Sequence, residues 1–260
     1  MIRQGLGFSW GAAAVSNAMW TGVWLKDVLE YAGIKSHDDG ARHVCILGAD
    51  KLPNGYYGTS IRREVAMVPA ADVLIAYKVN GEELTPDHGY PVRIIIPGYI
   101  GGRMVKWLTT IHVSSEESDN HYHFFDNRVL PPKVDAERAL AEGWWYKPQY
   151  IINELNINSA VNCPQHAEVL PLSGPAASST YTVSGYAYAG GGLAINRAEV
   201  SFDGGETWEL CDQQCPEKPR HMGKYWCWTF WSYKVDTARL LTAKDIRCRA
   251  WQGQNTQPQL

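Results

Sequence analysis

One segment of the chain concentrates residues whose types could bind an anion. His88, Arg93, Arg103 and Lys106 lie in two Gly- and Pro-rich loops that flank a short apolar run, Val92 to Ile96. Taken singly, these side chains fit turn residues or strand-end charges that reach solvent. Taken together, cations beside glycine-freed backbone N–H groups supply donors where a phosphate needs them. The segment therefore predicts an anion-binding cradle around a buried strand.

Three further segments carry polar or aromatic side chains beside small residues. They are Gly7-Phe-Ser-Trp10, Gly48-Ala-Asp50 with the following Tyr57-Gly-Thr-Ser-Ile61, and Asp126-Asn127-Arg-Val-Leu-Pro131. The Asp50 carboxylate can accept paired N–H donors from a heterocycle. Trp10 fits plain aromatic packing as well as the wall of a pocket, and Asn127 fits an Asx-turn as well as a ligand contact.

The histidines and cysteines do not have the spacing of a metal site. His121 and His123 are two residues apart, which points them to opposite faces of an extended chain. Cys211 and Cys215 have no second pair nearby to complete a zinc site. We expect no metal ligand among these residues.

The first part of the chain mixes helix and strand. Leu25, Val28, Leu29 and Ala32 have helical spacing, with Gly33 as the stop. Residues 43–47 and 73–79 read as strands, with a tight turn at 80–81. Residues 61–67 form an amphipathic stretch, and residues 135–143 read as a short helix with positions 136, 139 and 140 on one side.

The second part reads as strands separated by turns. Strand-like runs occupy residues 181–188, 194–202, 208–211, 225–235 and 245–251, which favours an immunoglobulin-type β-sandwich. The expected architecture is α+β, with domains at 1–154 and 155–260 and a linker at 154–159. In Tyr225-Trp-Cys-Trp-Thr-Phe-Trp231, alternation places Thr229 opposite Trp228 and Phe230. We expect the Thr229 face to be the one turned away from the sandwich core.

Composition sets broad limits on function. The chain has 260 residues, 45% hydrophobic and 20% charged, with a net charge of −3, which argues against a nucleic-acid surface. No apolar run approaches the roughly 20 residues that span a bilayer. Six cysteines are too few for a disulfide scaffold, so we interpret them as reduced thiols in a cytoplasmic protein.

The loops around residues 85–107 resemble the molybdopterin-binding segment of the sulfite oxidase family, which includes the molybdenum domain of eukaryotic nitrate reductases. The resemblance extends through Trp144-Trp-Tyr-Lys-Pro148, Gly185-Tyr-Ala-Tyr-Ala-Gly-Gly-Gly192 and Phe202-Asp-Gly-Gly-Glu-Thr-Trp208. It implies a molybdopterin domain followed by a dimerisation domain, and hence a homodimer through the sandwich. It also implies Mo-molybdopterin as cofactor, with haem and FAD in further domains and a haem domain as electron donor.

The resemblance also implies roles for individual residues. It assigns pterin and phosphate contacts to the positions His88, Arg93, Met104, Val105 and Lys106, and a pterin contact to Asp50. It places Trp10 in the substrate funnel and Asn127 against an oxyanion substrate, because the nitrate reductase branch has Asp-Asn-Arg-Val-Leu-Pro where sulfite oxidases have a tyrosine. Thr229 stands where sulfite oxidases have an arginine, and losing that cation fits a monoanion such as nitrate.

One departure limits these implications. The family holds molybdenum through a cysteine in a Cys-Ala-Gly-Asn-Arg-Arg segment that precedes the Gly-x-x-Trp element, and this sequence has no such segment. We therefore expect a fragment without the metal's protein ligand, which would reduce nitrate poorly by itself. The favoured function is oxygen-atom transfer from nitrate to molybdenum, giving nitrite. The alternatives are a sulfite oxidase-type enzyme and a catalytically inactive dimerisation or binding module.

Overall fold

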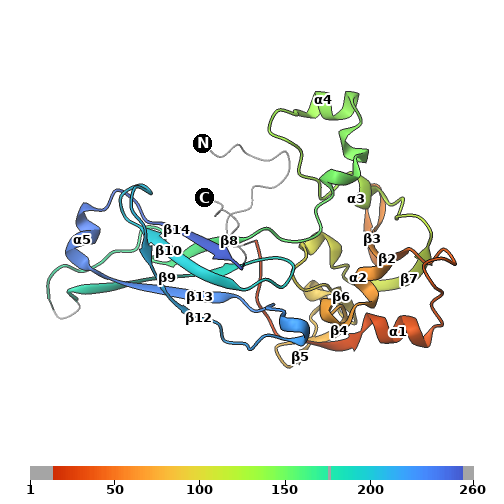
Figure 1. The fold of residues 1–260 in the computed structure, drawn as a ribbon, viewed down its shortest axis with the longest axis horizontal. Helices are drawn as coiled ribbons and strands as arrows, with labels where there is room; N and C mark the ends of the chain where they lie inside the picture. The colour runs from red at the N-terminus through yellow and green to blue at the C-terminus, as the bar shows by residue number, and fades with distance from the viewer. Residues whose placement is uncertain (1–13, 175–176, 254–260) are drawn as a thin grey trace. The chain divides into compact units, whose positions relative to one another are not determined.

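The computed structural model describes residues 14–174 and 177–253, which form two compact units (Figure 1). One unit comprises residues 18–155, and the other contains the chain from residue 156 onward. The division falls one residue from the expected one. Residues 14–17 group with the second unit, whereas the sequence prediction placed them in the first. Trp10 lies outside the described residues.

The first unit contains two antiparallel sheets. One is built on β4 (Leu74–Val79), which pairs with β1 (Trp20–Trp24), β5 (Glu82–Glu83) and β6 (Arg93–Ile95). The other has the order β3 (Gly55–Arg62), β2 (His43–Leu52), β7 (Leu108–Ser114). The predicted turn after β4 is confirmed, because Asn80 and Gly81 both have positive φ, 51° and 86°.

Helices close the core of this unit. In α1 (Leu25–Tyr31), Leu25 and Leu29 are buried four residues apart, as their spacing predicts. They pack with α2 (Arg63–Met67) and with β-sheet side chains in one cluster that includes Val44, Ile46, Ile94, Ile96 and Val105. The strand predicted between the two Gly- and Pro-rich loops is therefore a core strand.

The rest of the first unit is made of short helices and turns. These are η1 (Pro69–Ala71), η2 (Pro86–His88), η3 (Gly101–Arg103), α3 (His121–Phe124), α4 (Ala136–Ala141), η4 (Trp144–Tyr146) and η5 (Pro148–Tyr150). Two expectations were wrong here. Residues 121–124 are helical, not extended, and Leu140 of α4 is exposed whereas Ala139 is buried.

The second unit is an antiparallel β-sandwich. One sheet has the order β12 (Asp212–Gln214), β13 (Thr229–Asp236), β9 (Thr180–Tyr188), β8 (Asn158–Cys163). The other has the order β11 (Glu209–Leu210), β10 (Ile195–Ser201), β14 (Arg247–Gln252). Val183, Val200 and Trp231 belong to the core between them, and η6 (His221–Gly223) and α5 (Thr237–Thr242) lie in the connections. The linker expected at 154–159 is shorter, because β8 begins at Asn158.

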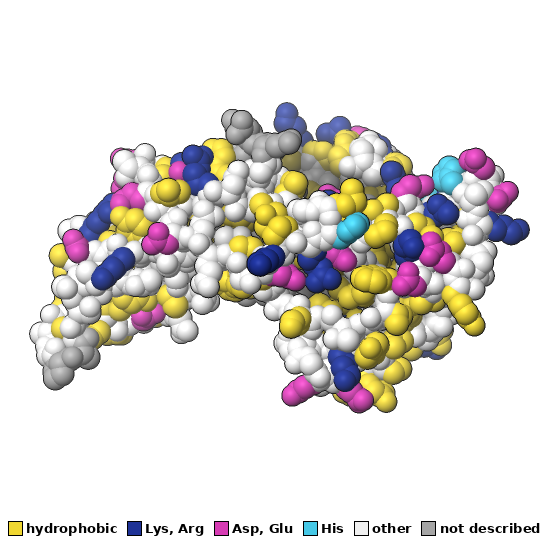
Figure 2. Space-filling model, turned by 60° about the horizontal axis from the view of Figure 1, so that its bottom comes forward, with side chains coloured by type: hydrophobic (Ala, Val, Ile, Leu, Met, Phe, Trp, Pro, Cys, Tyr) yellow, Lys and Arg dark blue, Asp and Glu magenta, His cyan; other side chains and the backbone are white. Residues whose placement is uncertain are grey.

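Charged side chains of both signs are interspersed on the face drawn in Figure 2, without a large patch of one sign. This distribution agrees with the small net charge of −3. Within the described residues, no helix is long and apolar enough to cross a membrane.

Candidate functional site

The two Gly- and Pro-rich loops are joined to each other by hydrogen bonds. The Lys106 ammonium donates to the Asp87 carbonyl at 2.9 Å, and the Trp107 indole donates to the Pro86 carbonyl at 2.9 Å. Gly89 has φ 99°, and a Cβ there would lie 2.9 Å from the Lys106 side chain. Glycine is therefore required for the left-handed backbone and for the close approach of the second loop.

Arg93 connects both loops from the start of β6. Its guanidinium donates to the carbonyl of His88 at 3.0 Å and to that of Met104 at 3.4 Å, and it stacks over Trp20 with 5.0 Å to the ring centroid. Burial lowers the pKa of Arg93, and its Nε is buried without a partner. His88 is exposed, with its Nδ1 2.7 Å from the Thr85 hydroxyl. Arg93 therefore has an unused N–H donor, and the exposed side chain of His88 belongs to the same pair of loops.

Asp50 lies next to the second loop. A Cβ on Gly48 would collide with both the Asp50 carboxylate and the Lys106 carbonyl, so glycine lets these two segments meet. Burial raises the pKa of Asp50, an effect opposed by a backbone hydrogen bond and by the Lys106 charge. Its Oδ1 is buried without a hydrogen-bond partner. A buried acceptor of this kind needs a donor from a bound molecule or water.

The structure therefore gathers five of the predicted cofactor residues at one place: Asp50, His88, Arg93, Met104 and Lys106. Two other residues are more deeply buried than the sequence analysis expected. The Val105 side chain is 1% exposed and packs in the core, so only its backbone is available to a ligand. Arg103, expected as a cation of the cradle, is completely buried and points into the protein.

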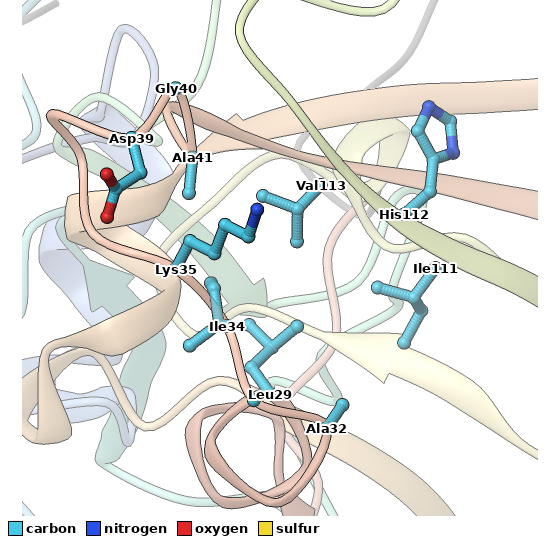
Figure 3. A pocket seen from close by; sticks show the side chains of 11 residues that line it. Leu29, Ala32, Ile34, Lys35, Asp39, Gly40, Ala41, Ile111, His112 and Val113 are labelled. Atoms are coloured by element: carbon cyan, nitrogen blue, oxygen red, sulfur yellow. The ribbon is translucent and has the colours of Figure 1, made fainter.

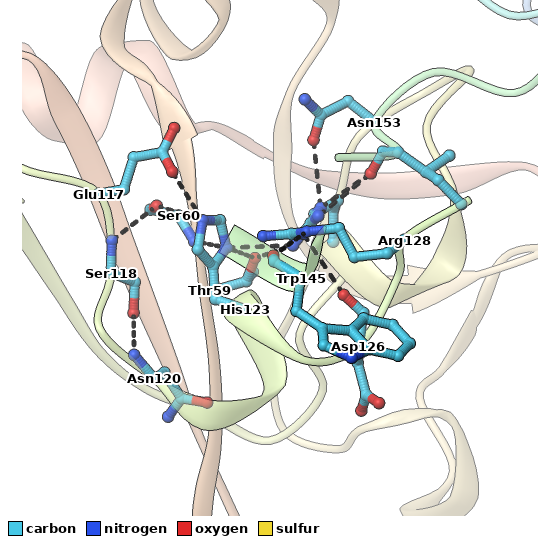
Figure 4. A network of polar contacts seen from close by, with 12 residues as sticks. Thr59, Ser60, Glu117, Ser118, Asn120, His123, Asp126, Arg128, Trp145 and Asn153 are labelled. Carbon is cyan, nitrogen blue, oxygen red and sulfur yellow. Dashed lines mark hydrogen bonds and ion pairs between the residues drawn. The ribbon is translucent and has the colours of Figure 1, made fainter. Parts of the chain in front are cut away.

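Arg103 is the centre of a buried polar network, and its partners Thr59, His123 and Asn153 are shown in Figure 4. Its guanidinium donates to the Thr59 hydroxyl at 2.7 Å, to the Ile152 carbonyl at 3.1 Å and to the Asn153 side-chain oxygen at 3.1 Å. It also donates to Nδ1 of His123 at 3.1 Å. These bonds satisfy a charge that has no access to water, as buried arginines require.

His123 is held neutral in this network. Burial lowers the pKa of His123; the hydrogen bond to Glu117 opposes that effect, and the Arg103 charge adds to it. The Arg103 guanidinium and the Ser60 backbone N–H both point at Nδ1, which makes that nitrogen the acceptor. Nε2 then carries the proton and donates to the Glu117 carboxylate at 3.5 Å. The spacing argument against a zinc pair assumed an extended chain, whereas residues 121–124 are helical. The hydrogen bonds of the network give His123 a structural role instead.

Asn127 lies beside the same network. Its backbone has φ 57°, a conformation that asparagine tolerates better than most residues. Its carboxamide occupies the space where a Cβ on Gly102 would be, and the Gly102 carbonyl accepts the Tyr57 hydroxyl proton at 2.7 Å. The sequence alone predicted no role for Tyr57 or Gly102. The Gly-Gly pair before Arg103 was the available signal for a close contact.

Thr229 has the opposite orientation to the one expected. It lies on the same face of β13 as Trp231 and Val235, which belong to the sandwich core, and it is 6% exposed. Phe230 is on the outer face and is 40% exposed. The assignment of the two faces was wrong because the aromatic side chains occupy both. The contact of Thr229 with a substrate stays a prediction.

The described cysteines give no candidate for the cysteine that holds molybdenum in the resembling family. All six are free, and Cys45, the one within residues 18–155, is buried with its pKa raised by desolvation. A metal-binding cysteine must be a thiolate, which such an environment disfavours. In the part of the chain that the structure describes, no group of three His, Cys, Asp or Glu side chains could hold a metal ion. The residue types gathered at the two loops therefore fit a pterin and its phosphate, whereas residues 14–174 and 177–253 contain no metal ligand set.

A surface hollow of about 320 Å³ lies elsewhere on the first unit (Figure 3). Its lining is largely aliphatic, with Leu29, Ile34 and Ile111 beside Lys35 and Asp39. None of the predicted cofactor or substrate residues lines it. We do not assign it to the site described above.

Comparison with known proteins identifies both units. The family described as oxidoreductase molybdopterin binding domain matches residues 1–122, and the Mo-co oxidoreductase dimerisation domain matches residues 149–260. The chain therefore belongs to the molybdopterin oxidoreductases of the sulfite oxidase family. The sulfane dehydrogenase SoxCD of Paracoccus pantotrophus has the same fold, with a TM-score of 0.65 and 23% identity over 90% of this chain and 51% of that one.

The particular relatives are plant nitrate reductases. The NADH nitrate reductases of Petunia hybrida and Nicotiana tabacum are each 57% identical over 263 aligned residues, which cover 100% of this chain. The inducible NADH nitrate reductase 2 of Glycine max is 55% identical. The chain spans 29% or 30% of the length of these relatives. It corresponds to their molybdenum-cofactor and dimerisation domains, which confirms the predicted family, fold class and cofactor.

Proposed function

We propose that this chain is the part of an assimilatory nitrate reductase that binds Mo-molybdopterin and converts nitrate to nitrite. The observation that carries the proposal is the 57% identity to nitrate reductases over the whole chain. The site chemistry supports it, because Asn127 has the residue type of the nitrate branch and lies against Gly102, in the loop that carries Met104 and Lys106. Bound Mo-molybdopterin supplies the oxygen-atom and electron chemistry.

The chain's own residues bind the cofactor and orient the nitrate. His88, Arg93 and Lys106 hold the pterin phosphate, with the exposed imidazole and the unpartnered Nε of Arg93 as donors. Asp50 accepts N–H donors of the pterin ring at its unpartnered Oδ1. Met104 and the backbone of Val105 border the ring. Asn127 donates an amide N–H to the nitrate oxygens, since a carboxamide nitrogen is a neutral donor suited to a monoanion.

The sandwich supports association into a homodimer. The outer face of the sheet that contains β9 and β13 carries a cluster of aromatic rings. The Tyr186 and Trp228 rings are stacked with 4.1 Å between their centroids, and Trp228 meets Phe230 edge-on with 6.5 Å between centroids. Tyrosine and tryptophan are enriched in protein interfaces. We assign this aromatic face to the dimer contact. The free cysteines support a reducing, cytoplasmic location, and a haem domain of the complete enzyme is the proposed electron donor.

The test is to load the chain with Mo-molybdopterin and measure nitrite production from nitrate with reduced viologen as donor. A second arm extends the chain at its N-terminus with the family's Cys-Ala-Gly-Asn-Arg-Arg segment, which supplies the thiolate ligand. We expect little nitrite from the first and sustained turnover from the second. Pterin content, measured by fluorescence after release, should be lower in an Arg93→Gln variant of either. Absence of nitrite from the extended, loaded chain would refute the proposal.

A sulfite oxidase-type activity is the second candidate. It is distinguished by comparing sulfite oxidation with nitrate reduction in the same extended, loaded chain. The identity to nitrate reductases and the presence of Asn127 both favour nitrate. Faster sulfite turnover would reverse that choice.

A further inference from the structure

The side chain of Asn127 lies flat on the backbone of Gly102. A Cβ on Gly102 would lie 2.5 Å from Cγ of Asn127 and no farther from its Oδ1 and Nδ2. A point almost equally far from these three atoms at that range lies above the plane of the carboxamide and not at its edge. The carboxamide therefore presents its face to Gly102, which leaves its N–H groups and its oxygen directed sideways from the contact.

The backbones on both sides of this contact are attached to the same residue, Ile152. The Asn127 carbonyl accepts the Ile152 N–H at 3.1 Å. Arg103, the neighbour of Gly102, donates to the Ile152 carbonyl from Nε at 3.2 Å and from Nη2 at 3.1 Å. These hydrogen bonds fix the separation between the two backbones, and a carboxamide fits between them because Gly102 has no side chain.

Each of the two residues is also held separately. The Gly102 carbonyl accepts the Tyr57 hydroxyl proton at 2.7 Å, and the Tyr57 ring stacks on Tyr122 with 5.4 Å between centroids. Asn127 has φ 57°, a left-handed conformation that few other residues tolerate. A methyl group at position 102 would therefore displace the Asn127 side chain, because both backbones are anchored.

The backbone conformation of Gly102 does not itself require glycine. Its φ lies outside the left-handed region, as does that of Gly101, so an alanine is sterically allowed at both positions. A Cβ on Gly101 would meet no atom within 4 Å, whereas the three nearest atoms to a Cβ on Gly102 all belong to the Asn127 carboxamide. The space beside Gly102 is thus occupied by this one side chain.

We infer that Gly102 is a positioning residue for the nitrate contact of Asn127: its bare Cα is the surface on which the carboxamide is held, in the loop that carries Met104 and Lys106. The inference rests on the proposed function for the identity of the nitrate contact. The packing of Gly102 against Asn127 is a property of the chain without cofactor, so it is tested separately.

The first measurement is a crystal structure of the chain with Gly102→Ala, beside the matched control Gly101→Ala. We expect the Asn127 carboxamide to be rotated away from its place in Gly102→Ala, with the backbone of residues 126–128 unchanged, and to stay in place in the control. The clash involves a short side chain that can rotate, so the variant should fold. A carboxamide that keeps its position in Gly102→Ala overturns the inference.

A second variant shows whether the new methyl group meets only Asn127. Asn127→Gly removes the obstacle and keeps a residue that accepts the left-handed backbone. The double variant Gly102→Ala/Asn127→Gly should therefore have a thermal midpoint no lower than that of Asn127→Gly alone. A lower midpoint in the double variant contradicts the inference, because the methyl group would then collide with another part of the unit.

The last measurement is nitrate kinetics in the extended, loaded chain. Gly102→Ala should raise the KM for nitrate about tenfold, with a smaller change in kcat and an unchanged pterin content, because one hydrogen bond to the substrate is lost and no cofactor residue is altered. Gly101→Ala should change the KM by less than about twofold, and so should Gly102→Ala in an Asn127→Gly background.

Two kinetic results would overturn the inference: an unchanged KM in Gly102→Ala, or a tenfold effect that persists when the Asn127 side chain is absent. In the second case Gly102 would act independently of the carboxamide. If the wild type makes no nitrite, the proposed function fails, whereas the crystal structures still decide whether Gly102 determines the place of the carboxamide.

Discussion

Replacing Arg103 tests whether the buried network needs the several N–H donors of a guanidinium or only a positive charge. The guanidinium reaches Thr59 and His123 on one side and Ile152 and Asn153 on the other. A lysine ammonium has a single nitrogen and cannot reach both sides at once. We therefore expect Arg103→Lys, which keeps the charge, to destabilise the first unit more than Arg103→Met, which removes it.

The structure sets the size of each effect. In Arg103→Met, the Thr59 hydroxyl can turn to donate to His123, which lies 2.9 Å away, and Asn153 is exposed enough to bind water. One poorly hydrated carbonyl, that of Ile152, loses its donor, which costs about 2–3 kcal/mol with the lost packing. In Arg103→Lys, an incompletely bonded charge stays buried, and the expected cost is about 3–5 kcal/mol.

Cys45 provides an assay specific to this unit. It is the one cysteine in residues 18–155, and it is 2% exposed, so an alkylating reagent reaches it only when the unit opens. The labelling rate at Cys45, followed by peptide mass spectrometry, reports the free energy of opening. A loss of about 3 kcal/mol should accelerate labelling by about 100-fold. Arg62→Lys, at an exposed position on β3, is the control.

The order of the two variants decides the result. If Arg103→Lys labels as slowly as the wild type, charge alone supports the network, and the geometric argument is wrong. If Arg103→Met is the less stable of the two, the buried charge contributes more than its hydrogen bonds.

Three other predictions follow from the same unit. Asp50→Asn should stabilise the cofactor-free chain, because it removes a buried carboxylate with an unpartnered oxygen, and should weaken pterin retention about tenfold, measured by pterin fluorescence. The pKa of His123 is below 6.5 in the folded chain, so below that pH the unfolded state binds more protons than the folded one. The free energy of unfolding should therefore fall as the pH drops from 6.5. Urea unfolding of His123→Asn should show a shallower fall of that free energy, by up to about 1.4 kcal/mol per pH unit. Gly22→Ala should destabilise the unit by at least about 2 kcal/mol in thermal unfolding, because its Cβ would lie 2.7 Å from the Ala76 backbone of β4. An unchanged Tm in that variant would contradict the close strand approach.

Sequence patterns predicted a helix or a turn correctly where the residues that determine it lie within one short segment. The spacing of Leu25 and Leu29 determines helix α1, and Asn80-Gly81 determines a tight turn, because each depends only on neighbouring residues. The cofactor residues came from the family resemblance, and the structure brings Asp50 to the loops that carry Arg93. The sequence alone did not reveal the roles of residues whose partners lie far away in the sequence.

Arg103 and Thr229 illustrate that limit. A basic residue beside glycines reads as a surface cation, and only the contacts with residues 152–153 reveal a buried one. In β13, aromatic residues occur at successive positions, so alternation cannot tell which face packs in the core. That choice is made by the partner sheet, which carries Val200 and Ala250.

The return of residues 150–155 to the 98–103 loop has a consequence for dividing the chain experimentally. Leu155 donates to the Gly98 carbonyl at 2.8 Å and Ile100 donates to the Asn153 carbonyl at 2.8 Å, so this stretch completes the first unit. The matched family region stops at residue 122. A protein expressed to that limit would leave the Arg103 guanidinium without its partners at Ile152 and Asn153, and it would omit Asn127, the proposed nitrate contact. A usable cut comes after Leu155.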